Sequence, residues 1–225
     1  VAEALRIYQN NVEGMIALLE AMVDAGVRQL VYSSSASVYG TPDDERVVET
    51  TATGPESPYG ETKLIGEWLL RDQAKATTFA HTSLRYFNVV GSGTPELRDT
   101  SPHNLFPIIF DQLVAGKTPY INGDDYPTAD GTCIRDYVHV ADLATSRVAA
   151  ARALAAGTPL ERVYNLGSGD GLSVRQIMTA MATVTGIDFE PEIGPRRAGD
   201  PDRIVADGSL AARDLKVTFG AITVL

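Results

Sequence analysis

The sequence predicts an α/β protein built on a parallel sheet. Short apolar runs of strand length alternate along the chain with longer segments that carry helical spacing. The run at 29–34 ends in small hydroxyl residues, as a buried parallel strand does where it opens into a loop. The repeated order of strand, helix, strand and helix indicates that the strands are parallel.

Each expected element has its own local signal. Val12 and Ile16 follow helical spacing in the first helix, and Gly26 is a natural end for it. Ser173 followed by Gln176 has the pattern of a capping box, which starts a helix. Helices are expected at 2–25, 58–75, 104–115, 142–156 and from 173 onward, and strands at 29–34, 79–87, 118–122, 134–140 and 162–166. The segments 41–58, 89–100 and 124–132 are expected to be loops.

Tyr59 and Lys63 carry the chemistry that the sequence predicts. They lie four residues apart on the helix expected at 58–75, and hence on one face of it. A phenol has a pKa of about 10, and an ammonium roughly 6 Å away lowers it by about 2 units. An oxidised nicotinamide ring would do about as much again, which would poise Tyr59 near pH ~6–7 as a general base. Leu64 and Trp68 are expected to form the core face of this helix.

Ser35 is the serine that we expect to share the proton with Tyr59. It directly follows the strand expected at 29–34, and ligand sites of doubly wound sheets lie at such carboxyl ends. Ser33 and Ser34 are expected to line the site or to serve the fold. The predicted catalytic residues are therefore Tyr59, Lys63 and Ser35.

Composition narrows the function further. The 225 residues, 44% of them hydrophobic and 21% charged, suffice for one large domain or two small ones. A net charge of −10 disfavours nucleic acid as a partner. The single Cys133 excludes a disulfide framework and favours a reducing cytoplasm, and no apolar run approaches the ~18 residues of a membrane span. His81, His103 and His139 lack metal-ligand spacing, so no metal site is expected.

Several segments taken together resemble the extended short-chain dehydrogenase/reductase family, and more narrowly its UDP-glucose 4-epimerases. They run in family order over nearly the whole chain: 10–14 (NNVEG), 33–40 (SSSASVYG), 57–60 (SPYG) with Lys63, 84–88 (LRYFN), 104–105 (NL), 125–132 (DYPTADGT), 135–140 (RDYVHV), 164–167 (YNLG), and 195–197 (PRR) with 199–200 (GD). The resemblance implies an incomplete Rossmann-like doubly wound parallel sheet and a smaller mixed α/β substrate-binding domain. The NAD-binding domain would comprise 1–89 and 140–171, and the substrate domain 90–139 and 172–225.

The family's glycine-rich phosphate loop is the part that we do not find. It lies near the family's amino terminus, and no three glycines here have its spacing. The segment 167–171 (GSGDG) comes after an expected strand, but its third glycine is one residue early, so we expect a structural turn. We therefore expect an amino-terminally truncated chain that lacks the first strands and helices, and a tail cut short after 211–215.

The resemblance also implies the roles of individual residues. The implied cofactor-binding residues are Asn10, Ser35, Tyr59, Lys63 and Phe87. The implied substrate-binding residues are Tyr86, Asn88, Asn104, Leu105, Arg135, Arg197 and Asp200. The two arginines suit diphosphate oxygens because the guanidinium presents a fork of donors. The chain departs from the family pattern at His103, at Ile204 and at Asn122, where the family usually has an aromatic residue that stacks on uracil.

The implied activity is interconversion of UDP-galactose and UDP-glucose by C4 epimerisation with bound NAD. Tyr59 would take the proton from the sugar O4 while hydride leaves C4, and the 4-keto sugar would turn before hydride returns. A cytoplasmic homodimer is also implied, through a four-helix contact that includes the first helix and the Tyr59 helix. Two alternatives stay open. One is a nucleotide-sugar dehydratase or decarboxylase, although the segment 35–37 (SAS) lacks the acid that dehydratases carry. The other is an inactive fragment or binding module.

Overall fold

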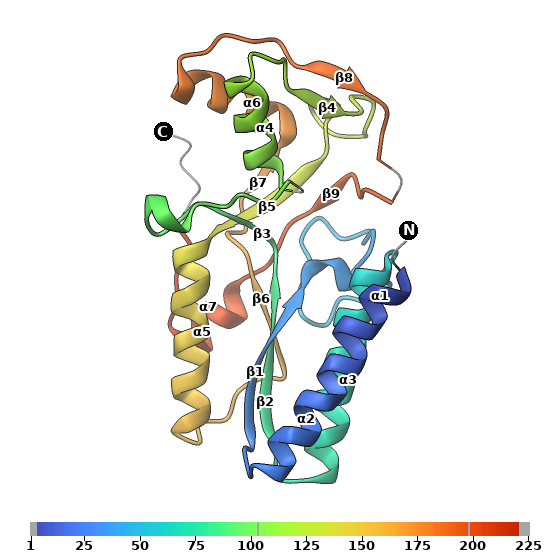
Figure 1. The fold of residues 1–225 in the computed structure, drawn as a ribbon, viewed down its shortest axis with the longest axis vertical. Helices are drawn as coiled ribbons and strands as arrows, with labels where there is room; N and C mark the ends of the chain where they lie inside the picture. The colour runs from blue at the N-terminus through green and yellow to red at the C-terminus, as the bar shows by residue number, and fades with distance from the viewer. Residues whose placement is uncertain (1–3, 103, 198, 221–225) are drawn as a thin grey trace.

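The computed structural model describes residues 4–102, 104–197 and 199–220 (Figure 1). The helices are α1 (Ala4–Tyr8), the π-helical η1 (Gln9–Glu13), α2 (Gly14–Asp24), α3 (Pro58–Ala76), α4 (Leu105–Val114), α5 (Val140–Ala155), α6 (Val174–Thr185) and α7 (Ser209–Leu215). The strands are β1 (Gln29–Ser35), β2 (Ala80–Tyr86), β3 (Asn88–Val90), β4 (Tyr120–Asn122), β5 (Ile134–His139), β6 (Val163–Leu166), β7 (Gly171–Ser173), β8 (Glu192–Gly194) and β9 (Arg203–Ile204). Short 3-10 turns lie at Ala36–Val38 and Pro95–Leu97.

A parallel sheet of three strands, in the order β1-β2-β6, confirms the predicted fold class. The register places Ser33 beside Leu84 and Ser35 beside Tyr86. Because parallel strands run the same way, the serines that end β1 lie at the same edge as the end of β2. This edge is where ligands bind in open parallel sheets.

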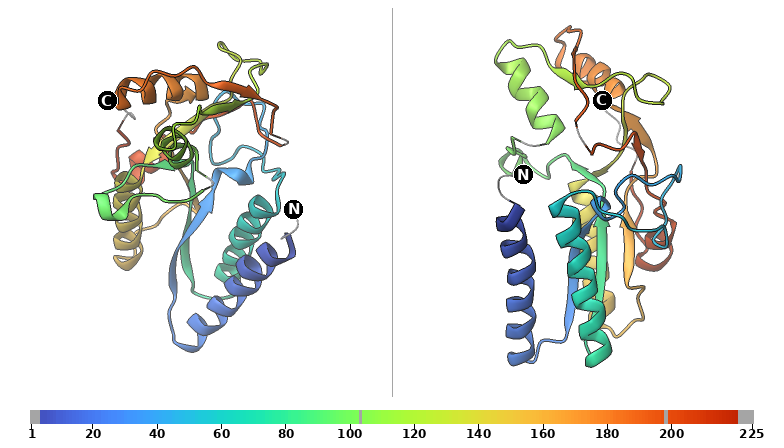
Figure 2. Two further views of the ribbon diagram at one scale, coloured as in Figure 1. Left: turned by 45° about the horizontal axis from the view of Figure 1, so that its top comes forward. Right: turned by 90° about the vertical axis from the view of Figure 1, so that its right-hand side faces the viewer.

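Helices cover both faces of this sheet. Figures 1 and 2 show α1, α2 and α3 on one face and α5 on the other, with α7 beside β6. Under α2 and α3, Met15, Leu19 and Met22 pack with Leu70 and Phe79. On the α5 side the buried residues are Leu84, Val138, Leu143, Ala150, Tyr164, Leu166, Ala211, Leu215 and Val217. Burial on both faces explains the apolar character of the strands.

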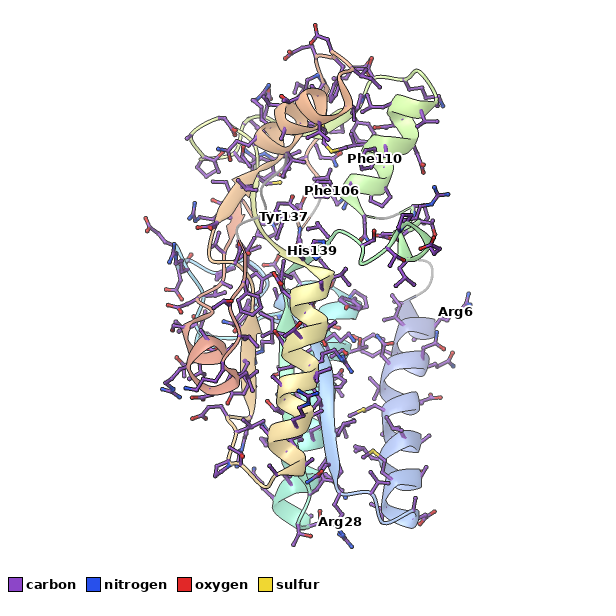
Figure 3. All side chains as sticks on the ribbon, turned by 90° about the vertical axis from the view of Figure 1, so that its left-hand side faces the viewer. Arg6, Arg28, Phe106, Phe110, Tyr137 and His139 are labelled. Carbon is purple, nitrogen blue, oxygen red and sulfur yellow. The ribbon has the colours of Figure 1, made fainter. Side chains whose placement is uncertain are left out.

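The remaining strands form a second layer beyond the carboxyl edge. β5 pairs with β3, β7 and β9, and a separate parallel pair joins β4 to β8. The core of this part lies between α4, α6 and β5 (Figure 1). There Phe106 of α4 meets Tyr137 of β5 edge to face, with ring centroids 5.8 Å apart (Figure 3). The division of the chain into NAD-binding and substrate domains at the predicted boundaries stays a prediction.

All the helices and strands expected from the sequence are present in the structure. The first helix contains a π-helical turn at Gln9–Glu13 that its spacing did not reveal, and Gly26 ends the helix with φ of 68°. Strands β3, β7, β8 and β9 and helix α7 were not expected, because elements of a few residues show too little periodicity.

The expectation that Trp68 faces the core is wrong. Trp68 is 46% exposed, whereas Leu64 is buried. The buried face of α3 is centred on Glu67 and Leu70, and Leu64 lies at its margin. Sequence reasoning misplaced this face because one of its central residues is charged. No described helix is long and apolar enough to cross a membrane.

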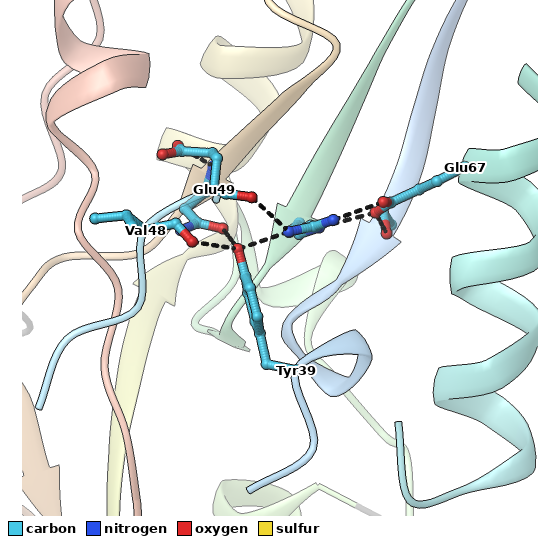
Figure 4. A network of polar contacts seen from close by, with 7 residues as sticks. Tyr39, Val48, Glu49 and Glu67 are labelled. Carbon is cyan, nitrogen blue, oxygen red and sulfur yellow. Dashed lines mark hydrogen bonds and ion pairs between the residues drawn. The ribbon is translucent and has the colours of Figure 1, made fainter. Parts of the chain in front are cut away.

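That charged residue belongs to a buried polar network (Figure 4). Arg85 of β2 donates to both carboxylate oxygens of Glu67, at 2.9 and 2.7 Å. Glu67 also accepts a hydrogen bond from Ser34 Oγ at 2.5 Å. Arg85 Nη1 donates at 2.8 Å to the hydroxyl of Tyr39, which in turn donates to Asn165. The network therefore joins α3 to all three strands of the sheet.

Replacing Arg85 with Met should destabilise the fold by about 3–5 kcal/mol, because Glu67 would remain buried without its partner. Chemical denaturation followed by circular dichroism measures this change. Arg71→Met is the matched control: its pair with Asp72 is exposed, with side-chain exposures of 41% and 60%, so its loss should change the free energy of unfolding far less. Equal effects of the two substitutions would contradict the role given to the buried pair.

Candidate active site

The first turn of α3 places Tyr59 at the carboxyl edge of the sheet. Ser57 caps the helix by accepting from the Gly60 N–H at 3.1 Å, and Pro58 follows with its backbone angle already set. A Cβ added to Gly60 would lie 2.5 Å from the carbonyl oxygen of Ser37. Glycine at this position therefore lets the helix approach the segment that follows β1.

Lys63 is held between two aromatic rings. Its Nζ lies 5.4 Å from the ring centroids of both Tyr59 and Tyr32 and donates to the carbonyl oxygen of Ser33 at 2.9 Å. Burial lowers the pKa of Lys63. Among the residues that the structure describes, no carboxylate forms an ion pair with it. The predicted juxtaposition of an amine and a phenol is thus present.

Ser35 completes the group by hydrogen bonding with Tyr59. Burial raises the pKa of Tyr59, and the hydrogen bond with the Ser35 side chain acts in the opposite direction. Ser35 Oγ accepts from the Ser37 N–H at 3.2 Å and from the Ser37 hydroxyl at 3.0 Å, so its own proton is directed elsewhere. With the protein's own groups alone, the phenol ionises above its ordinary pKa rather than near neutrality. The predicted ionisation near pH ~6–7 included the effect of the ammonium but not the cost of burying a phenolate.

A cavity of about 250 Å³ lies in the second layer. Its walls contain all but one of the predicted substrate-binding residues: Asn88, Asn104, Leu105, Arg135, Arg197 and Asp200. They come from β3, α4, β5 and the segment after β8, which are far apart in the sequence. Arginine and amide groups that converge on one cavity suit an anionic, oxygen-rich ligand.

The cavity's two arginines differ in their partners. Arg135 is buried and paired with Asp200, Nη2 to Oδ1 at 2.8 Å. Arg197 is exposed at the cavity wall and forms no ion pair within the described part of the chain. Asn104, the residue before the first turn of α4, donates its side-chain N–H to Asp99 at 2.6 Å. Arg197 is therefore the cation with the most capacity left for a ligand.

The loop at 167–171 contacts a carboxylate of the protein itself. Asp136, which is fully buried, accepts from the backbone N–H groups of Ser168, Gly169 and Ala206 at 2.7, 2.9 and 3.0 Å. These donors would otherwise suit a phosphate. The contact gives the expected structural turn a physical reason.

Three predicted residues lie outside both the cavity and the group formed by Ser35, Tyr59 and Lys63. The hydroxyl of Tyr86 contacts Ser33 at 3.3 Å, on the sheet side. Phe87 is buried in a cluster with Val38, Leu64 and Ile204, so packing accounts for most of its surface. Asn10 is exposed on the π-helical turn, a distortion that is frequent at functional sites. The cofactor and substrate roles of these residues stay predictions.

Sequence reasoning missed several cavity residues. Cys133, just before β5, and Tyr137 of β5 lie two positions to either side of Arg135, and Tyr120 shares a face of β4 with Asn122. The period of two in a strand could have found them, because it places alternate side chains on one face. On β4 the aromatic residue that lines the cavity is thus Tyr120, two positions before the residue where the family pattern led us to look.

The histidines have structural surroundings. His139 Nδ1 accepts from the Ala141 N–H at 3.1 Å and so caps α5. His81 is buried, and burial lowers its pKa. His103 lies outside the described residues. Within the described ranges, no group of three or more His, Cys, Asp or Glu side chains could hold a metal ion.

This arrangement defines a class of protein: Rossmann-like α/β proteins with a Ser, Tyr and Lys group at the carboxyl edge of the sheet. Residues 1–167 match the protein family described as "NAD dependent epimerase/dehydratase family". The chain therefore belongs to the NAD dependent epimerase/dehydratase family.

Named relatives agree with this assignment. The chain is 43% identical over 215 residues to UDP-glucose 4-epimerase of Lactobacillus helveticus, covering 94% of this chain and 65% of the relative. It is 44% identical over 219 residues to that of Erwinia amylovora, covering 94% and 64%. The chain thus spans a little under two thirds of the length of these curated relatives.

Solved structures show the same similarity. The UDP-glucose-4-epimerase from Stenotrophomonas maltophila, with bound NAD and formylated UDP-arabinopyranose, superposes with a TM-score of 0.91 at 41% identity, covering 98% of this chain and 67% of that one. The UDP-glucose 4-epimerase from Bifidobacterium longum, in complex with NAD+ and UDP, gives 0.89 at 36% identity, covering 100% and 68%.

Ultraviolet difference titration of the chain against its Tyr59→Phe variant should place the ionisation of Tyr59 above pH 10.0, because burial raises its pKa. Adding NAD should move this midpoint downward, since a cationic ring favours the phenolate. A midpoint below 10 without ligand would show that Lys63 outweighs burial, against the arrangement described above.

Proposed function

We propose that this chain interconverts UDP-galactose and UDP-glucose by C4 epimerisation, with NAD as cofactor. The observation that carries the proposal is the convergence of Asn88, Asn104, Arg135, Arg197 and Asp200 on one cavity. Tyr59, Lys63 and Ser35 lie together at the carboxyl edge of the neighbouring sheet. Similarity to UDP-glucose 4-epimerases at 43% identity supports the same substrate class.

The residues at the sheet edge fit a dinucleotide. Lys63 supplies a cation without a carboxylate partner among the described residues, and Ser35 and Tyr59 supply hydroxyls. These groups suit a ribose and a positively charged ring that favours the phenolate. NAD, when bound, would supply a hydride acceptor and donor. Ser35, Tyr59 and Lys63, together with Asn10 and Phe87, are the residues that we propose to hold it.

Tyr59 is the proposed base in the chemical step. It takes the proton from the sugar O4, and Ser35 shares that proton through its hydrogen bond with the phenol. Lys63, whose Nζ lies 5.4 Å from the centroid of the Tyr59 ring, stabilises the phenolate. C4 would lose its hydride to the cofactor and, once the 4-keto sugar had rotated in the site, would receive it back on its other face. Tyr59 would then return the proton to O4, so the net reaction is an isomerisation.

The cavity is the proposed binding site for the nucleotide part of the substrate. Arg197 and Arg135 would meet the diphosphate oxygens, while Asn88, Asn104 and the Leu105 backbone add neutral contacts. Asp200 would orient a ribose hydroxyl of the substrate, and it also orients Arg135 through their ion pair. We place Tyr86 beside the hexose. Firm binding of the diphosphate and loose binding of the sugar would let the keto intermediate turn.

Tyr59→Phe should lower the conversion of UDP-galactose to UDP-glucose at least about 100-fold, because the phenol that accepts the proton is lost. Product analysis by NMR measures the rate and the product together, and circular dichroism checks that the variant folds. Conversion near the parent rate would remove Tyr59 from the mechanism. A product that had lost water or carbon dioxide would favour a dehydratase or decarboxylase, and no product from the parent chain would favour an inactive fragment.

Arg197→Met should weaken the binding of UDP about 10-fold, because a charged hydrogen bond to phosphate is worth about 1.5–3 kcal/mol. Isothermal titration measures the Kd. The neighbouring Arg196 provides the control, since it pairs with Asp125 and lies over the ring of Tyr126, outside the cavity wall. If Arg196→Met weakened the binding of UDP as much as Arg197→Met does, the proposed contact between Arg197 and the diphosphate would be wrong.

We also propose a homodimer through the helices on the first face of the sheet. Support comes from apolar side chains left exposed there, Leu18 at 47% and Val23 at 56% on α2 and Trp68 at 46% on α3. Analytical ultracentrifugation should show a dimer that Trp68→Glu converts to monomer, and a monomeric parent chain would contradict it. A cytoplasmic location is part of the proposal, because the single Cys133 is free; cell fractionation tests it.

A further inference from the structure

Arg147 is a cation for which neither the family pattern nor the proposed mechanism has a use. It lies on α5, on the opposite face of the sheet from α3 (Figure 1). Its Nη1 donates to Ser33 Oγ and, at 2.6 Å, to the hydroxyl of Tyr86. The side chain is half-buried at the carboxyl ends of β1 and β2.

Two cations therefore flank Ser33. Lys63 donates to its carbonyl oxygen at 2.9 Å, and Arg147 donates to its hydroxyl. Neither is paired with a carboxylate in the part of the chain that the structure describes, although the chain has 29 acidic and only 19 basic residues. Half-buried charges without counter-charges are costly, so this edge favours an anion.

Arg147 also has donors left to offer. A guanidinium carries five N–H groups in a planar fork, and only Nη1 of Arg147 is engaged within residues 4–102, 104–197 and 199–220. Ser33 and Tyr86 orient the group through neutral hydroxyls, so its charge is not neutralised. The fork matches the spacing of phosphate oxygens, and the carboxyl ends of parallel strands are where nucleotides bind.

We propose that Arg147 is a further cofactor-binding residue, which binds a phosphate oxygen of the dinucleotide from the face opposite Lys63. The inference rests on the proposed use of NAD. It adds a phosphate contact from α5, at a distance along the chain from every residue that the sequence pattern assigned to the cofactor.

The test is isothermal titration of the chain with NAD at two salt concentrations. Arg147→Met should raise the Kd for NAD about 10-fold or more and reduce its dependence on salt, because a screened charge contact is lost. Arg147→Lys keeps the positive charge but loses the fork of donors, so its Kd for NAD should lie between those of the parent chain and Arg147→Met. Arg152→Met is the matched control: it removes an exposed arginine from the same helix and should leave the Kd unchanged.

UDP, which we place in the cavity lined by Arg197, provides the second readout. Arg147→Met should leave the Kd for UDP unchanged. An unchanged Kd for NAD, equal weakening of NAD and UDP, or an unaltered salt dependence would each overturn the proposal, as would a parent chain that binds no NAD. Loss of NAD binding in Arg147→Met with normal UDP binding would support the inference even if the product assay excluded epimerisation.

Discussion

The buried ion pair between Arg85 and Glu67 is the constraint on which the candidate site depends. It joins β2 to α3 with side-chain exposures of 5% and 8%, so both charges lie in a region of low dielectric. Displacing either would leave the other unpaired at a cost of several kcal/mol. Glu67 is one turn from Lys63, and Lys63 is one turn from Tyr59. The pair therefore fixes the rotation of α3, and with it the direction in which the phenol and the amine point.

Charge is distributed differently at the two parts of the proposed site. At the sheet edge, Lys63 and Arg147 lack carboxylate partners among the described residues, and this suits a cofactor that carries a diphosphate. In the cavity, Asp200 pairs with Arg135 and leaves Arg197 as the available cation. Although the chain has a net charge of −10, Lys63, Arg147 and Arg197 thus present positive groups without carboxylate partners among the described residues where anionic ligands are proposed to bind.

Local signals predicted local structure well. The Ser173 capping box is present with both of its hydrogen bonds, and Gly26 ends the first helix as expected. Predictions were less complete where contacts between distant residues determine the local conformation or the buried face of a helix. The π-helical turn that contains Asn10 left no sign in the spacing, and Trp68 is exposed because Glu67 occupies the buried face in its place. A buried charge breaks the apolar pattern from which a core face is inferred.

By itself, the sequence determined the order of the longer helices and strands, the parallel sheet, and the placement of Tyr59 and Lys63 on one helix face, because these follow from periodicity, capping and spacing within short segments. Motif resemblance added the cavity residues, but only the tertiary structure brought them together on one wall. The structure alone decided that Asp136 occupies the glycine loop, that Asp200 pairs with Arg135, and that Arg147 lies beside Ser33. These contacts join residues far apart along the chain, and burial and charge, which govern them, depend on how the elements pack rather than on any local pattern.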